Sequence, residues 1–349
     1  MPAPASAADY NEKWWRKAVS PGSHVPRRRV LVSLAASPFA ALPARAQRGF
    51  PERPIRIVVP YGPGTGNDTF ARQFTARFPQ ILGVPAVIDN RPGGNAILGT
   101  EIAARSAPDG YTLLFGAEQA VCYNPALYRR PLPYDMLRDF TPIAGLVTAT
   151  YLLVVAPNLP ARSVAELVAL AKASPGSLAF GSTGAGTASR IIGEVFARDA
   201  GIELTSVAYQ SGTAPLFADL LAGRISMMFY PFQFVRELLA TGRARALATT
   251  GAERAPFLPD LPTLDELGYR RSTASSSFGV YAPAGTPADR IERIAEAFRQ
   301  ALHEPELHAQ LTADGTAVDF VPPARFGAVF AARLERCREL VTMAGASLE

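Results

Sequence analysis

From residue 50 onward, the chain alternates short apolar runs with segments in which apolar residues recur every three or four positions. Ile55–Val59 is an apolar run typical of a buried strand. Phe70, Phe74 and Phe78 then recur at four-residue spacing, which predicts one face of a helix. The same reading predicts strands at 85–89 and 111–116 and a helix at 97–105. This alternation predicts an α/β fold built on a doubly wound parallel sheet.

A second series of strands and helices begins at Tyr151–Ala156. Ser163 followed by Glu166 has the spacing of a capping box and predicts a helix start there, and Thr263 followed by Glu266 repeats it. Phe278–Pro283 closes the series and, like 153–157, is an apolar strand that ends in Ala-Pro. We interpret these two strands as crossings between two lobes. Other predicted strands lie at 178–181, 203–208, 226–230 and 244–249, and other helices at 213–222, 286–303 and 326–343.

Three glycine-rich loops each precede a predicted helix, at residues 60–68, 181–190 and 209–215. The unpaired N–H groups and the dipole at a helix start attract anions. In an open α/β sheet such loops lie at the carboxyl ends of the strands, where ligands bind. The loops therefore predict one shared anion site. The alternative is that the glycines serve only tight turns, while Asp68, Thr187 and Thr213 only cap helices.

Motifs for catalysis or cofactor binding are missing from the sequence. Neither dinucleotide nor P-loop glycine spacing occurs, and there is no G-x-S-x-G motif. His303 and His308 lie five residues apart, which does not put both on one helix face, so a zinc site is not expected. The formal charge of +5 comes entirely from residues 1–46, and residues 47–349 have no net charge. We expect no cofactor, no metal and no nucleic-acid partner.

The first 46 residues have the pattern of an export signal. Arg27-Arg28-Arg29 precedes the apolar stretch 30–42, and Ala44-Arg45-Ala46 is an A-x-A cleavage signal. We predict cleavage near Ala46 and a periplasmic location; the alternative is a disordered basic tail. Two cysteines, Cys122 and Cys337, follow the signal, and the sequence leaves open whether they pair or are two buried thiols.

From Phe50 to the C-terminus the sequence resembles the Bug family, the extracytoplasmic solute-binding proteins of tripartite tricarboxylate transporters. The stretches that carry the resemblance include FPERPIRIVVPYGPGTGNDTFAR, DNRPGGNAILGTEIAARSAPDGYTLLFG, RDFTPIAGLV, SVAELVALAKASPGSLAFGSTGAGT, DLLAGRISMMF and YAPAGTP. The resemblance implies a two-lobed Venus-flytrap fold of the type II periplasmic-binding class, with two doubly wound sheets and hinge strands. With the strand pattern, it assigns 47–150 and 278–349 to lobe 1 and 151–277 to lobe 2. It also implies a protein without catalysis that binds a small organic carboxylate. We expect a monomer that delivers this ligand to membrane transporter subunits or reports it to a sensor.

The resemblance also implies which residues bind the ligand. By motif, they are Gly64, Thr65, Gly66 and Asp68 in the first loop, and Gly184, Gly186, Thr187 and Ser189 in the second.

Other positions depart from the family pattern and are expected to face the variable end of the ligand: Arg190, Tyr230, Gln210-Ser211 and Ala117-Glu118-Gln119. Arg190 would hold a second carboxylate in a bidentate manner, and Glu118 would favour an amine or hydroxyl. Tyr61, Tyr209 and Tyr230 would form apolar walls. The alternatives are that Arg190 and Glu118 pair with each other or face solvent, and that the tyrosines pack in the core.

Two other functions stay open on the sequence. A periplasmic enzyme would use Asp68 and Glu118 as acid and base, which requires both carboxyl groups to converge on one substrate atom. A ligand-sensing regulator on the same bilobal fold should carry a helix-turn-helix at one end, and none is evident in the sequence.

Overall fold

The computed structural model describes residues 49–184, 186–209 and 213–348. The predicted export signal lies outside the described residues, as do Gln210 and Ser211 of the third loop. The first series of elements comprises β1 (Ile55–Val59), α1 (Gly66–Thr75), α2 (Phe78–Leu82), β2 (Ala86–Asn90), α3 (Ile97–Ala104) and β3 (Thr112–Ala117). Every strand expected in this series is therefore confirmed to within about a residue.

The middle of the chain contains most of the remaining strands. Its elements are the π-helix η1 (Gln119–Tyr123), α4 (Asn124–Leu127), β4 (Phe140–Val155), α5 (Val164–Ala173), β5 (Ala179–Ser182), α6 (Ala188–Ala200), β6 (Thr205–Ala208), α7 (Thr213–Leu221), β7 (Met227–Pro231), α8 (Phe232–Ala240), β8 (Arg245–Thr249) and the 3₁₀ turn η2 (Arg270–Ser272). The chain then ends with β9 (Ser275–Pro283), α9 (Ala288–Leu302), α10 (Pro305–Ala313), β10 (Thr316–Val321) and α11 (Pro323–Ala344).

The strands form one continuous hydrogen-bonded sheet in the order β2-β1-β3-β9-β4-β7-β5-β6, and β8 and β10 also pair with β4. The triplets β2-β1-β3 and β7-β5-β6 are parallel, as expected for doubly wound units. The two predicted doubly wound sheets are joined by β4, which runs through both halves. It pairs with β9 as far as Thr150 and with β7 from Tyr151 onward. Both of these pairings are antiparallel, a feature that the sequence did not predict.

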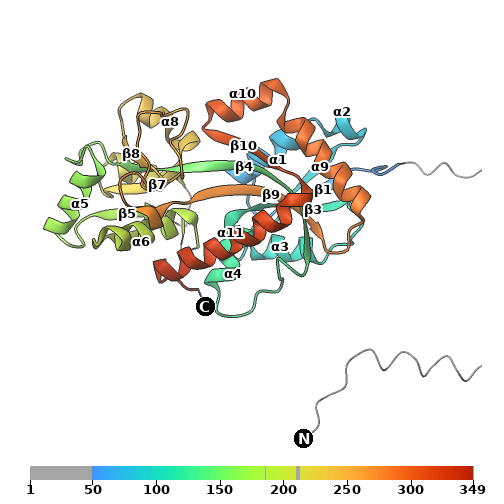
Figure 1. Cartoon of the computed structure of the whole chain (residues 1–349), viewed down its shortest axis with the longest axis horizontal. Coiled ribbons are helices and arrows are strands. Elements are labelled where there is room, and N and C mark those ends of the chain that lie inside the picture. Colours follow the sequence, from blue (N-terminus) through green and yellow to red (C-terminus); the bar gives the residue numbers. More distant parts are fainter. Residues whose placement is uncertain (1–48, 185, 210–212, 349) are drawn as a thin grey trace, which may run out of the picture. The chain divides into compact units, whose positions relative to one another are not determined.

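The described part of the chain is two-lobed, with helices grouped around each half of the sheet (Figure 1). Helices α1, α2, α3 and α9 lie around β1 and β3, whereas α5, α6 and α8 lie around β5 and β7. The long helix α11 packs against α6, β4, α4 and η1, so it contacts elements of both halves. None of the described helices is long and apolar enough to cross a membrane.

The phenylalanine face predicted for a single helix is divided between α1, which ends at Thr75, and α2, which begins at Phe78, and it forms part of the first core. Phe74 and Phe78 are fully buried and Phe70 is 6% exposed. The Phe70 and Phe74 rings stack at 5.5 Å, and Phe78 meets Phe298 of α9 edge-on at 5.0 Å. These contacts fix α1, and hence the loop before it, against the sheet.

The two predicted capping boxes had different outcomes. Ser163 accepts a hydrogen bond from the Glu166 amide at 3.2 Å and begins α5, as expected. Thr263 also accepts a bond from the Glu266 amide, at 3.0 Å, but the residues that follow form turns. A cap therefore satisfies one amide without forming a helix where no apolar face continues the pattern.

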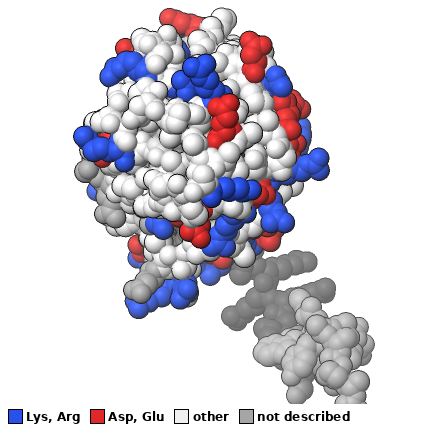
Figure 2. Space-filling model, turned by 90° about the vertical axis from the view of Figure 1, so that its left-hand side faces the viewer, with Lys and Arg blue, Asp and Glu red and all other residues white. Residues whose placement is uncertain are grey.

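Charged side chains of both signs are interspersed on the face drawn in Figure 2, with uncharged surface between them. This face has no large area of one sign, in agreement with the zero net charge of residues 47–349.

Candidate ligand-binding cleft

A cleft of about 610 Å³ opens between the two halves of the sheet. Its walls come from the carboxyl ends of strands and from the first turns of helices. The lining residues are Pro60–Asn67, Phe70, Pro92, Gly93, Asn95, Ala96, Ala117, Gln119, Ala149, Tyr151, Thr183, Thr187–Ser189, Thr213, Tyr230, Pro231, Gln233, Phe234, Ser276 and Phe278. The cleft therefore lies at the carboxyl ends of the strands, where the sequence analysis expected the anion site.

The first glycine loop contributes one wall of the cleft. Gly64, Thr65 and Gly66 all line it, directly before and within the first turn of α1. Thr65 is the N-cap, and its hydroxyl oxygen accepts a long hydrogen bond of 3.4 Å from the Asp68 amide. A Cβ atom at Gly66 would lie 2.8 Å from Cζ of Phe234, on the opposite wall. Glycine at this position therefore lets the two walls approach each other closely.

The second glycine loop contributes the facing wall through the start of α6. Thr187, Ala188 and Ser189 line the cleft. The Thr187 hydroxyl donates to the Gly184 carbonyl at 2.8 Å and lies 3.0 Å from the Ser189 hydroxyl, so it does not cap the helix. Because the side chain leaves the first amides of α6 uncapped, they are available to an anion in the cleft.

Two more helices begin at the cleft. Pro231 is the N-cap of α8 without a side-chain capping bond, and Gln233 and Phe234 of its first turn line the cleft. Thr213, the first residue of α7, also lines it. With α1 and α6, the positive ends of several helix dipoles meet at one cavity.

The cleft is polar but carries no formal charge. Among the residues that the structure describes, none of those lining the cleft has a charged side chain. Hydroxyl and amide side chains line it together with six aromatic rings, those of Tyr61, Phe70, Tyr151, Tyr230, Phe234 and Phe278. An anion here would be held by neutral N–H and O–H donors.

Asn95 and Gln119 form a polar network in the cleft lining. Gln119 was among the positions expected to face the ligand, whereas the sequence analysis missed Asn95. The Gln119 amide donates to Asn95 Oδ1 at 2.6 Å, and Asn124 Nδ2 donates to the Asn95 carbonyl at 2.7 Å. Asn95 has a left-handed backbone with φ of 58°, and Ala96 follows at 72°. Left-handed backbone outside glycine is uncommon and concentrates at functional sites. The run Gly93-Gly94-Asn95 is the sequence signal that could have revealed this turn.

The expected role of Asp68 is corrected by its position. Its carboxylate is buried outside the lining and accepts hydrogen bonds from the Gly64 amide at 2.9 Å, Asn90 Nδ2 at 3.0 Å and Arg72 Nε at 3.0 Å. Burial acts to raise the pKa of Asp68, but the bonds from Arg72, Gly64 and Asn90 outweigh it and hold the pKa below its usual value. Asp68 therefore holds the first loop in shape. Its carboxylate accepts the hydrogen bond of the Gly64 amide, so that amide is not free to bind a ligand.

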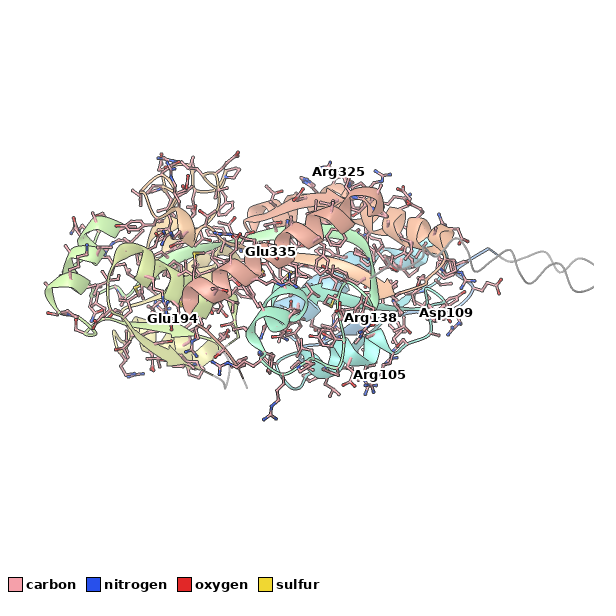
Figure 3. All side chains as sticks on the ribbon, turned by 60° about the horizontal axis from the view of Figure 1, so that its bottom comes forward. Arg105, Asp109, Arg138, Glu194, Arg325 and Glu335 are labelled. Carbon is pink, nitrogen blue, oxygen red and sulfur yellow. The ribbon has the colours of Figure 1, made fainter. Side chains whose placement is uncertain are left out.

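Glu118 and Arg190 do not line the cleft and do not pair with each other. The Arg190 guanidinium lies 3.6 Å from Glu194, which is labelled on α6 in Figure 3. Glu118 is 6% exposed and accepts a 3.4 Å bond from the Ser277 hydroxyl. Burial raises the pKa of Glu118 to about 7, against the opposing effects of Arg333 and Ser277.

Tyr209, Gly184 and Gly186 also lie outside the lining. The Tyr209 hydroxyl donates to Asp219 at 2.6 Å; burial and this bond raise its pKa to about 12. A Cβ atom at Gly186 would lie 2.4 Å from Asn95 Nδ2, so Gly186 packs against the polar network instead. Of the thirteen predicted site residues, the cleft brings together Tyr61, Gly64, Thr65, Gly66, Thr187, Ser189 and Tyr230.

A two-lobed α/β fold with a neutral, helix-start-lined cleft between its halves defines the class of periplasmic solute-binding proteins. A solved structure of the periplasmic binding protein BugD matches this chain at 28% identity and a TM-score of 0.75. Two others are Rpa4515 of R. palustris with adipate, at 32% identity and a TM-score of 0.78, and MatC of Rhodopseudomonas palustris with malate, at 29% and 0.73. The matches cover 84% to 86% of this chain and all of each neighbour.

Sequence comparison identifies the family. The profile of the TctC family, the tripartite tricarboxylate transporter family receptors, matches residues 70–341. The protein BugT of Bordetella pertussis is 31% identical over 300 residues, which cover 86% of this chain and 92% of BugT. The chain belongs to the TctC family and is a solute-binding protein of the Bug type, so the resemblance seen in the sequence is confirmed.

Proposed function

We propose that this protein captures a small organic carboxylate in the cleft and presents it to the membrane subunits of a tripartite tricarboxylate transporter. The observation that carries the proposal is the meeting of several helix starts and neutral donors in one cavity without charged side chains. Such donors replace the hydration of a carboxylate without fixing the ligand by an ion pair. Adipate and malate, the ligands of two structural neighbours, are the first candidates.

The proposal assigns contacts to the predicted residues that line the cleft. Gly66 and the start of α6 at Thr187 and Ser189 supply N–H and O–H donors, and Tyr61 and Tyr230 supply walls. With the lobe boundaries predicted from the strand pattern, 47–150 with 278–349 and 151–277, Tyr61 and Gly66 belong to one lobe. Thr187, Ser189 and Tyr230 then belong to the other. Signal cleavage near Ala46 and a periplasmic location belong to the same proposal; the structural neighbours include periplasmic proteins.

Catalysis is not part of the proposed function. The enzyme alternative required Asp68 and Glu118 to converge on one substrate atom. Asp68 is bound by Arg72 and Asn90, whereas Glu118 bonds to Ser277, and neither carboxylate lines the cleft. This separation supports a receptor rather than an acid–base enzyme.

A thermal-shift screen followed by calorimetry tests the proposal. The purified protein is screened against mono-, di- and tricarboxylates, amino acids and aromatic acids, with adipate and malate included. A ligand at one hundred times its Kd should add roughly 2.7 kcal/mol to the free energy of unfolding. Ser189→Ala should weaken binding of the best ligand, whereas Arg190→Ala, outside the lining, should leave its Kd within about two-fold. A flat response to all carboxylates would contradict the proposal.

A further inference from the structure

A cluster of nucleophilic side chains lies outside the cleft lining, between η1 and α11. The sulfur atoms of Cys122 and Cys337 and a carboxylate oxygen of Glu118 all lie within 4.8 Å of one another. Each cysteine is 1% exposed, and the two sulfurs are not bonded to each other in the structure. The cleft and its proposed ligand use none of these three groups.

Glu118 is incompletely satisfied in this cluster. Its Oε1 accepts the single long bond from Ser277, while its Oε2 is buried without a hydrogen-bond partner among the described residues. The Arg333 guanidinium on α11 is near enough to favour the charged form of the carboxylate. A buried carboxylate oxygen with free lone pairs, beside two thiols, can accept a thiol proton.

We infer that Cys122 and Cys337 form a disulfide in the exported protein, and that Glu118 accepts the proton of the thiol that closes it. The inference rests on the proposed periplasmic location, because that compartment oxidises thiol pairs. The two sulfur atoms already lie within 4.8 Å of each other, and a disulfide requires that they approach to about 2.05 Å.

The chemistry requires a disulfide-bearing oxidant, such as a protein disulfide or oxidised glutathione. The thiolate of one cysteine attacks the oxidant, which forms a mixed disulfide and releases one thiolate of the oxidant. The second cysteine loses its proton to Glu118 and attacks the first sulfur, which releases the other thiolate. The protein is oxidised by two electrons and the oxidant is reduced by two. Because both sulfurs are buried, the first step precedes the docking of α11, and the second is intramolecular.

The bond would join the wall of the cleft to the longest helix. Cys122 belongs to η1, which begins at Gln119 in the cleft lining, and Cys337 belongs to α11, on which Figure 3 labels the neighbouring Glu335. The closed loop of about 215 residues is long, so the bond removes much freedom from the unfolded chain.

Oxidative refolding of the full chain tests this inference independently of location. The reduced, denatured protein is refolded with reduced and oxidised glutathione, alkylated under denaturing conditions, and weighed intact by mass spectrometry. We expect no alkylation without reductant and a mass lower by about 2 Da than that of the reduced chain. Reductant should lower the Tm of the oxidised protein by roughly 5 to 10 °C, and have no effect on Cys122→Ser or Cys337→Ser.

Glu118→Gln tests the role of the carboxylate, with Glu292→Gln as a matched control at an exposed position of α9. The rate at which the disulfide closes from the mixed disulfide should be lower by about ten-fold or more in the Glu118 variant. In the control variant this rate should equal that of the wild type. Equal rates of disulfide closure in both variants would show that Glu118 does not accept the thiol proton. Two alkylated thiols after refolding would overturn the disulfide. One bound Zn²⁺ per reduced chain, lost in Glu118→Gln, would assign the cluster to a metal instead.

Discussion

Individual side chains decide what charge the cleft accepts. Gln119 lines the cleft, and its 2.6 Å hydrogen bond to Asn95 fixes its side chain. The described lining has no charged side chain that could neutralise a charge introduced by substitution. The neutrality of the site is therefore a property of a few amide and hydroxyl residues.

We expect Gln119→Glu to weaken binding of a carboxylate ligand ten-fold or more. A carboxylate a few ångströms from the ligand costs on the order of 1 to 3 kcal/mol by repulsion. Calorimetry with the best ligand of the screen measures this loss. Gln310→Glu, exposed on α10, adds the same charge away from the cleft and should bind normally. Equal affinities in the two variants would place the ligand elsewhere.

Glu118 should make the stability of the protein depend on pH. Its pKa of about 7 in the folded state lies above the ordinary value of 4.5, so the folded protein keeps a proton that the unfolded chain releases. The free energy of unfolding therefore falls as pH rises from about 4.5 to about 7, by roughly 3 kcal/mol from this residue.

Denaturant titrations of Glu118→Gln across this range check the prediction. The variant cannot ionise, so its stability relative to the wild type should increase as pH rises. Glu292→Gln, at an exposed position of α9, provides the reference for an exposed carboxylate. Parallel stability curves for wild type and Glu118→Gln would show that Glu118 titrates normally.

At the scale of elements, glycine positions set how closely the loops approach. Gly186 precedes α6 and packs against Asn95, where a Cβ atom would lie 2.4 Å from Nδ2. That contact connects the second loop with the network that orients Gln119.

Gly186→Ala should reduce ligand affinity about ten-fold or more, because Asn95 or the α6 loop must move. Gly327→Ala on α11 meets no atom within 4 Å and serves as the control. Calorimetry and thermal unfolding of both variants separate a change in the cleft from a loss of stability. An unchanged Kd in Gly186→Ala would show that the second glycine loop can move without changing the ligand site.

The sequence predicted those elements whose pattern is local. The apolar run of β1 and the phenylalanine spacing of α1 are local signals, and both were confirmed. The first half of β4 was missed because Pro142 and Gly145 interrupt its apolar pattern. The glycine loops were recognisable by composition, whereas Tyr151, Ser276 and Phe278 carry no motif. They enter the cleft only because the strands bring distant segments together.

At the scale of the whole molecule, binding should respond weakly to ionic strength. No described lining residue is charged, so no ion pair in the cleft is available for salt to screen. We expect Kd to change by less than about three-fold between about 0.05 and 0.5 M salt. Calorimetry at several salt concentrations measures this dependence, with an uncharged osmolyte as the control. A steep loss of affinity would point to a charged contact beyond the described lining.

The change of partner along β4 also has a mechanical consequence. Rotation of one lobe relative to the other would twist β4 near Thr150 and Tyr151, where the ladder passes from β9 to β7, together with the start of β9 beside it. Tyr151 is also part of the cleft wall. A solute bound in the cleft would therefore contact the segment about which the lobes turn, and solutes of different size should hold the lobes at different angles and present differently shaped surfaces to the membrane.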